Sequence, residues 1–217
     1  MAADSPSTPA GSGRGGRLTL WGVAAVFLAV SMFGNHQQPD GVPETHRASG
    51  AGAGAATSAD PRQTGEGLSR SAPTRLHIPR IAVDAPFTTL SIGASGQLQP
   101  PPAADTNLVG WYADGVSPGE SGTAIIAGHV DTVTSPAVFA HLDELEPGDR
   151  FSVERADGST ADFVVDDSET FAKDDFPSDR VYEDAERPEV RLITCAGDYD
   201  RTVRDYTDNL VVFAHLV

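Results

Sequence analysis

From residue 73 onward, the sequence breaks into short apolar runs, several rich in β-branched residues and bounded by glycine, proline or aspartate. Such runs favour β-strands, and the Asp-Gly pair at 157–158 favours a tight hairpin between two of them. Only residues 135–142 predict a helix, with Ser135 as its N-cap and a proline at its first position. Because closure removes exposed strand edges, we predict a mainly β domain folded as a closed or nearly closed barrel. The strands are expected at 75–83 (bent or at an edge, because it contains Pro79), 122–128, 149–155, 160–165, 190–195 and 209–216.

The first third of the chain differs in composition from the rest. Residues 1–73 carry five basic and five acidic side chains, so residues 74–217 carry the whole net charge of -16. An uncharged apolar run after Arg14 and Arg17 is typical of a membrane-spanning signal-anchor, with a cleaved signal peptide and a buried core helix as alternatives. We divide the chain into a cytoplasmic tail (1–17), a transmembrane anchor (18–34), a flexible Gly/Ala/Ser-rich linker (35–73) and a folded domain (74–217).

Charge and cysteine content exclude several classes of function. A net charge of -16 excludes binding of nucleic acid by phosphate neutralisation and a polybasic membrane-surface protein. One cysteine excludes an intrachain disulfide framework and multi-cysteine zinc sites. The acidic stretch at 166–186 lacks the spacing of a calcium loop and predicts a solvated surface. We therefore expect no metal and no cofactor.

The lone cysteine, Cys195, ends a predicted buried strand. Packing is the ordinary role of a free cysteine, but an exported thiol risks oxidation, so its retention favours a nucleophile. His129 also ends a predicted buried strand, and histidine is the usual partner that activates a thiol. Backbone N–H groups after Cys195, or Arg201 or Arg204, would stabilise an oxyanion, although the arginines have nearby aspartates as alternative partners.

Three segments carry a resemblance to a known family. Residues 127–131 (AGHVD), residues 192–197 (LITCAG) and the terminal strand at 209–214 resemble the sortases, and residues 110–122 are similar to the actinobacterial class F branch. The resemblance extends from about residue 74 to the end. It implies a closed eight-stranded β-barrel with one or two short helices. It also implies a cysteine transpeptidase that cleaves an LPXTG-like sorting signal through a thioacyl intermediate and transfers the product to a cell-wall amine.

The resemblance also implies roles for individual residues. Cys195 would be the nucleophile, His129 the general acid and later the base, and Thr194 a residue of the substrate groove. Many sortases have an arginine at the start of the last strand, where this chain has residues 207–209 (TDN). We assign that role to Arg204, with Arg201 as the next candidate and a hydrogen bond from Asn209 as a substitute.

The partners and location follow from the same resemblance. The partners would be secreted proteins bearing the sorting signal, a peptidoglycan stem-peptide or lipid II amine, and the cell membrane, with no nucleic acid. The protein would cross the cell membrane once, with its catalytic domain extracellular. Two alternatives stay open: an exported cysteine hydrolase, and a non-catalytic barrel that binds wall peptides.

Overall fold

Residues 67–94 and 96–217 are described by a computed structural model of the chain. The predicted cytoplasmic tail, the transmembrane anchor and residues 35–66 of the linker lie outside the described residues. Within the described ranges, no helix has the length and apolar character needed to cross a bilayer.

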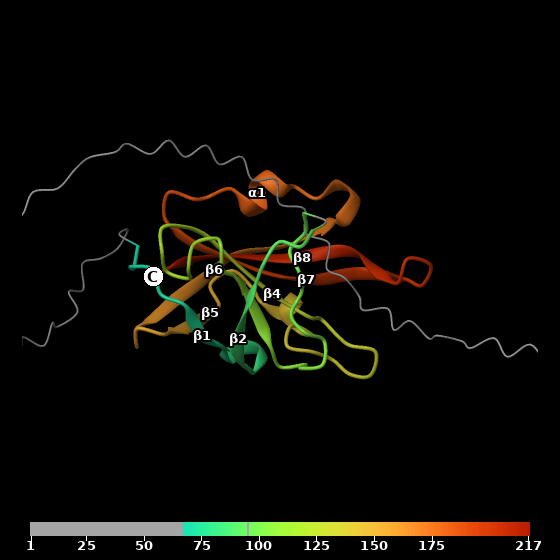
Figure 1. Ribbon diagram of the computed structural model, residues 1–217, viewed down its shortest axis with the longest axis horizontal. Coiled ribbons are helices and arrows are strands. Elements are labelled where there is room, and N and C mark those ends of the chain that lie inside the picture. Colours follow the sequence, from blue (N-terminus) through green and yellow to red (C-terminus); the bar gives the residue numbers. More distant parts are fainter. Residues whose placement is uncertain (1–66, 95) are drawn as a thin grey trace, which may run out of the picture.

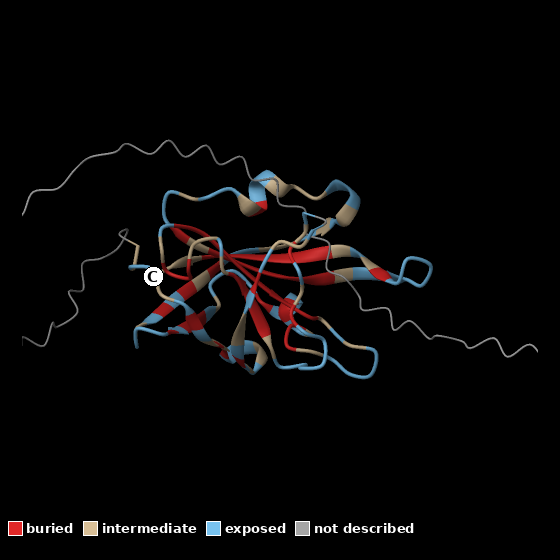
Figure 2. Cartoon of the chain, in the orientation of Figure 1, coloured by how far each residue is buried: buried red, intermediate tan, exposed pale blue. Residues whose placement is uncertain are grey.

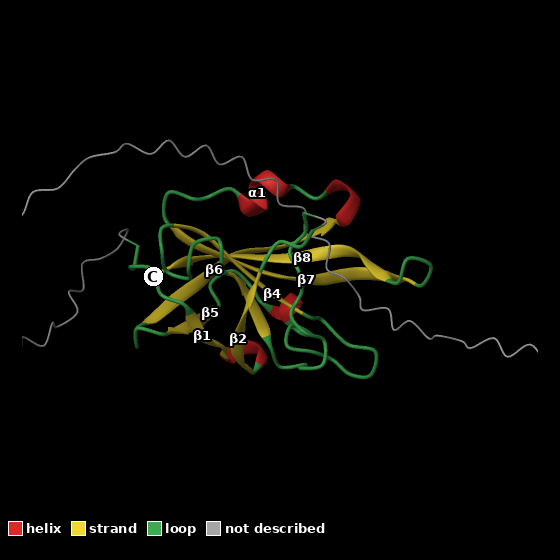
Figure 3. Ribbon diagram, in the orientation of Figure 1, coloured by secondary structure: helices red, strands yellow, loops and turns green. Residues whose placement is uncertain are grey.

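Eight strands form a closed barrel in the order β1-β2-β3-β4-β7-β8-β6-β5, and β1 pairs with β5 to complete it. The β2–β3 and β4–β7 pairs are parallel, and the other pairs are antiparallel. The mainly β, closed-barrel prediction is confirmed, and Figure 3 shows how little helix accompanies the strands. The strands are β1 (Pro73–Ile78), β2 (Val83–Leu90), β3 (Val109–Tyr112), β4 (Gly122–Gly128), β5 (Arg150–Arg155), β6 (Thr160–Ala172), β7 (Pro188–Asp200) and β8 (Asp205–Leu216).

The first predicted strand, 75–83, is wrong as a single element. Proline fixes its own φ and lacks an N–H, so Pro79 ends β1 and begins a short 3-10 turn, η1 (Pro79–Ile81). Ala82 then adopts a left-handed conformation, with φ of 53°, and the chain reverses into β2. Neither strand is an edge, because β1 pairs with β2 and β5, and β2 pairs with β1 and β3.

The predicted helix at 135–142 is also wrong. After β4, Asp131 pairs with Pro136 in an isolated antiparallel bridge, and the N–H of Phe139 returns to the carbonyl of His129 at 3.0 Å. The Thr132 hydroxyl and the Ser135 backbone bond each other, which holds a turn where the helix would begin. A single 3-10 turn, η2 (Leu142–Glu144), follows. The segment packs the buried Val138 and Phe139 against the end of β4 instead of forming a helix.

Two apolar clusters lie on opposite faces of the sheet, because successive side chains of a strand alternate. Residues such as Ile126, Leu192 and Val212 fill the interior of the barrel. Their neighbours Ile125, Ile193 and Val211 belong to a second cluster on the outer face. Figure 2 shows buried residues running along the strands, consistent with a sheet that is covered on both sides in this region.

The segment between β6 and β7 covers the outer cluster. It contains the 3-10 turn η3 (Lys173–Asp175) and the helix α1 (Ser178–Tyr182), and it lies over β7 and β8 in Figure 1. Val181 of α1 is fully buried, and Phe176 and Tyr182 pack against the same cluster. This segment closes the outer face beside the part of β7 that carries the cysteine.

The folded part begins before residue 74, where the domain boundary was predicted. The N–H of Leu68 donates to the Gly119 carbonyl at 2.7 Å. Arg70 donates to the Gly115 carbonyl at 2.8 Å and lies over the ring of Trp111. Residues 67–72 therefore belong to the packed domain.

Candidate active site

Cys195 and His129 come from neighbouring parallel strands. The β4–β7 register pairs Ala127 with Ile193, so two further residues along each strand set His129 beside Cys195. Because side chains alternate, His129 shares the face of Ala127, and Cys195 shares the face of Ile193, which is the same outer face. Both are buried, with 6% and 5% of their surface exposed. The structure thus brings together the cysteine and the histidine that the sequence singled out.

The histidine ring is held by the segment before β3. Nε2 of His129 lies 2.8 Å from the Pro101 carbonyl. Because a carbonyl oxygen only accepts, Nε2 carries the hydrogen of this bond. The proton that the ring gains or loses in a reaction is then carried by Nδ1. Nothing in the sequence pattern pointed to Pro101 as the group that fixes this tautomer.

Thr194 locks the two strands at the level of the site. It is 1% exposed, and its hydroxyl donates to the Gly128 carbonyl at 2.8 Å. The resemblance placed Thr194 in the substrate groove. In this structure the side chain joins β7 to β4, directly before Cys195 and His129, and its place in the substrate groove stays a prediction.

The Cys195 thiol has a high pKa. Burial is the main cause that raises the pKa to about 11; the Asp205 and Asp131 carboxylates add to the shift, and Lys173 opposes it. Only the thiolate is a strong nucleophile. At neutral pH the resting thiol therefore keeps its proton, and attack requires a group that takes this proton.

A cation that the sequence analysis did not single out, Lys173, contacts the thiol. Lys173 Nζ lies 3.8 Å from Cys195 Sγ and 2.7 Å from Asp205 Oδ1. Lys173 is the only lysine of the 217-residue chain, which has fourteen arginines. This rarity is the one feature of the sequence that could have drawn attention to Lys173. Only the fold shows that this lysine and the lone cysteine are in contact.

Arg204 and Arg201 are not brought to Cys195. The β7–β8 register pairs Asp200 with Asp205, so both arginines lie at the tip of this hairpin. Asp200 is five residues beyond Cys195, about 16 Å along an extended strand. Both arginines are exposed, and Arg204 has a left-handed φ of 60° with its N–H donating to the Asp200 carbonyl. In Figure 1 the hairpin projects beyond the barrel.

Asn209 lies where the missing arginine was sought. It is the direct partner of Cys195 in the β7–β8 ladder and is fully buried. Neither atom of its amide has a hydrogen-bond partner among the described residues. The Tyr206 hydroxyl donates to Asp131 at 2.6 Å, which joins β8 to the loop after His129. Burial raises the pKa of Tyr206, and this bond and the nearby charge of Asp131 add to the shift.

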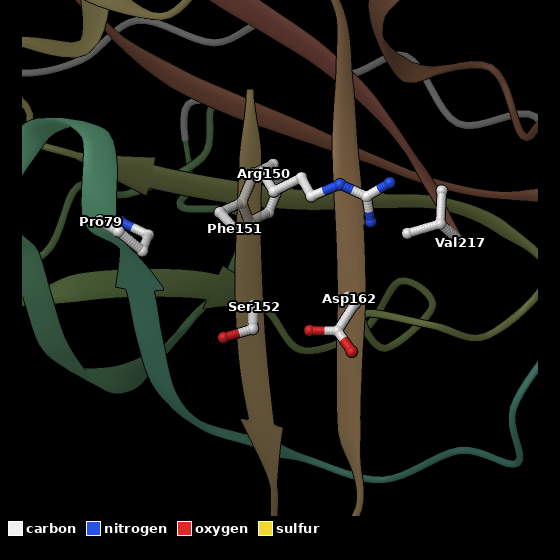
Figure 4. Close-up of a pocket in the computed structure, with 6 residues that line it drawn as sticks. All are labelled: Pro79, Arg150, Phe151, Ser152, Asp162 and Val217. Atoms are coloured by element: carbon white, nitrogen blue, oxygen red, sulfur yellow. The ribbon is translucent and has the colours of Figure 1, made fainter. Parts of the chain in front are cut away.

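A pocket of about 310 Å³ lies elsewhere, beside β5, β6 and the C-terminal residue. The Ser152 and Asp162 side chains project from neighbouring strands there (Figure 4). It contains none of the residues around Cys195 and is separate from the candidate active site. It is lined by Pro79, Arg150, Phe151, Ser152, Asp162 and Val217.

The acidic stretch at 166–186 is mostly exposed, and its ion pairs are at its N-terminal end. Glu169 accepts two bonds from Arg180, and Asp166 pairs with His215 and Arg187. Across residues 67–94 and 96–217, no three His, Cys, Asp or Glu side chains are grouped so as to hold a metal ion.

The fold and the site define a class: a closed β-barrel with a cysteine on one strand and a histidine directly after the adjacent strand, an arrangement suited to nucleophilic catalysis through sulfur. The family model described as "Sortase domain" matches residues 76–217, and the chain belongs to the sortase family. Family membership supports cysteine transpeptidase chemistry. No match was found among curated protein sequences.

Solved sortase structures share the fold. The complex of Streptococcus agalactiae sortase C1 and MTSET is 25% identical with a TM-score of 0.52, covering 68% of this chain and 70% of that chain. Sortase A from Corynebacterium diphtheriae is 21% identical with a TM-score of 0.51, covering 69% of this chain and 62% of that chain.

Proposed function

We propose that this sortase-family protein cleaves an LPXTG-like sorting signal and transfers the acyl product to a cell-wall amine. The observation that carries the proposal is the placement of Cys195 and His129 on one face of adjacent strands, β7 and β4. The proposal includes the class F branch, a membrane anchor at residues 18–34 and an extracellular catalytic domain. The acceptor would be a peptidoglycan stem peptide or lipid II.

The chemistry needs one proton carrier and one nucleophile. Because the thiol is protonated at neutral pH, its proton passes to Nδ1 of His129 as Sγ attacks the scissile carbonyl carbon. The S–C bond forms, and the carbonyl electron pair moves to oxygen. On collapse the C–N bond breaks, and His129 gives the proton to the leaving amine, which leaves a thioester on Cys195.

The second half reverses these roles. An incoming amine attacks the thioester carbonyl and loses a proton to His129. The C–S bond then breaks, and the proton returns to Sγ, so the enzyme is regenerated with no net change in protons. Water attacking in place of the amine would give hydrolysis.

The test is cleavage of a quenched LPXTG-type peptide by the full chain in detergent. We expect Cys195→Ala to abolish cleavage and His129→Ala to lower its rate by roughly 10²–10⁴-fold, the usual contribution of a positioned acid–base group. His141→Ala is the matched control, because that histidine is 65% exposed and pairs with Glu144 away from the site. Equal activity of wild type and Cys195→Ala would overturn the proposal.

A further inference from the structure

The single lysine and the single cysteine of the chain are in contact. Lys173 Nζ lies 3.8 Å from Sγ, and its ion pair with Asp205 is largely shielded, with side-chain exposures of 13% and 9%. An ammonium that is held this far from water is ordered by its partners and does not sample the surface freely. It therefore forms a fixed positive charge at the nucleophile.

The strand register explains why the lysine reaches this point. β6 pairs with β8, with Phe171 opposite Asn209 and Ala172 opposite Asp208. Lys173 follows directly as the first residue of η3. Phe171 packs in the same outer cluster as Cys195, so the end of β6 lies beside the site. The ammonium thus enters the site from the end of β6, while β8 itself provides no basic side chain there.

The other basic side chains of this region are bonded to carboxylates or lie at the hairpin tip. Arg191 is bonded to Glu189 and lies over the ring of Phe213, and Arg180 is bonded to Glu169. Arg201 and Arg204 lie at the hairpin tip. Among the charged groups that shift the pKa of Cys195 in the described part of the chain, Lys173 is the one cation.

A cation or other hydrogen-bond donor at the nucleophile favours acyl transfer. Negative charge develops first on sulfur and then on the carbonyl oxygen of the tetrahedral intermediate. An ammonium has three N–H donors. One bonds Asp205 and one faces Sγ, which leaves the third for the substrate oxygen.

We propose that Lys173, positioned by Asp205, is the third catalytic residue of this sortase-family site and stabilises both the thiolate and the oxyanion. This inference rests on the proposed function. Lys173 donates hydrogen bonds and keeps its proton throughout, so the proton transfers between Cys195, His129 and the amines are unchanged. Asp205 is a positioning residue, because it holds the ammonium and does not touch the substrate.

The experiment compares Lys173→Met, Lys173→Arg and the double variant Lys173→Met/Asp205→Asn in the full chain. Two quantities are measured: the pH profile of Cys195 alkylation by iodoacetamide, and cleavage of the quenched LPXTG-type peptide. Arg75→Met is the matched control, because it removes an exposed positive charge that is paired with Asp84 on β1 and β2, outside the active site. Thermal unfolding is followed for every variant.

We expect Lys173→Met to move the alkylation profile to higher pH and to lower kcat by roughly 10²–10³-fold, the usual loss of one oxyanion donor. Lys173→Arg keeps the charge and should recover part of the rate. The double variant leaves no buried unpaired carboxylate, so it should regain thermal stability without regaining activity. Arg75→Met should stay within about twofold of wild type, as exposed charges contribute little.

Recovery of cleavage in the double variant would show a merely structural ion pair and would overturn the proposal. So would an unshifted alkylation profile in Lys173→Met, or loss of cleavage in Arg204→Ala with retention in Lys173→Met. Failure of the proposed function is distinguishable. In that case the wild type cleaves no peptide, and the alkylation profiles alone decide whether Lys173 stabilises the thiolate.

Discussion

Asn209 faces Cys195 directly across the β7–β8 ladder, fully buried, and its amide makes no hydrogen bond among the described residues. A buried polar group without a partner costs about 1–3 kcal/mol. Folding stability does not explain such a residue beside the nucleophile, so we expect the amide to take part in the reaction.

Replacing Asn209 with leucine, which has a similar volume, should therefore raise the free energy of unfolding by about 1 kcal/mol, because the unsatisfied amide is removed. Peptide cleavage should fall at the same time. Chemical denaturation and the cleavage assay measure the two effects. Lower stability of Asn209→Leu would mean that the amide is hydrogen-bonded in solution.

Thr194 offers a second test, because its hydroxyl bonds the carbonyl directly before His129. Thr194→Val keeps the shape and removes this buried hydrogen bond, so stability should drop by about 1–3 kcal/mol. Cleavage should drop more than stability explains, while Thr194→Ser should preserve both. If Thr194→Val changed substrate KM alone, the residue would act in the substrate groove, as the family resemblance implied.

Gly128 is constrained by its close approach to Phe139. A Cβ at position 128 would lie 2.6 Å from Phe139 Cδ2, so Gly128→Ala should cost roughly 1–3 kcal/mol by overpacking. It should also impair catalysis, since it displaces the adjacent His129. Adding Phe139→Leu makes room and should restore part of both. Full activity of Gly128→Ala alone would contradict this account of how His129 is positioned.

The high thiol pKa predicts a specific pH dependence. Because burial raises the pKa of Cys195 to about 11, alkylation of the folded protein should rise about tenfold per pH unit from pH 7 to 10. In denaturant the profile should level off near the ordinary value of about 8.5. Between about pH 8.5 and 11 the Cys195 thiol stays protonated in the folded protein but ionises in the unfolded chain. The free energy of unfolding therefore falls as the pH rises through this range. A folded-state plateau below pH 8 would contradict the burial argument.

The central strands could be predicted because each carries its own signal. Gly122–Gly128 is an uninterrupted apolar run, and the Asp157-Gly158 turn is flanked by alternation, so β4 and the β5–β6 hairpin were correct. β3 was missed because Val109–Tyr112 is only four residues long and takes its stability from β2 and β4. At 135–142, the N-cap and proline pattern predicted a helix, but bonds between Thr132 and Ser135 form a turn there instead.

From the sequence, a site residue could be predicted only where its position in its own strand determines whether it reaches the active site. Cys195 and His129 end apolar runs, and the parallel β4–β7 pairing sets them side by side. Arg204 was chosen for its nearness in sequence, but the β7–β8 pairing continues past a bulge to Asp200 and places Arg204 at the hairpin tip. Lys173 lies 22 residues from Cys195, and only the β6–β8 register shows that they meet.

Mass spectrometry of the products that the full chain forms from an LPXTG-type peptide, with triglycine present, shows directly whether the acyl group is transferred to an amine. We expect a product extended by triglycine at the threonine carbonyl, formed by wild type and absent with Cys195→Ala. Release of only the hydrolysed acid would identify a hydrolase. No product across a set of pentapeptide motifs, with Cys195 also inert to alkylation, would contradict a catalytic role altogether.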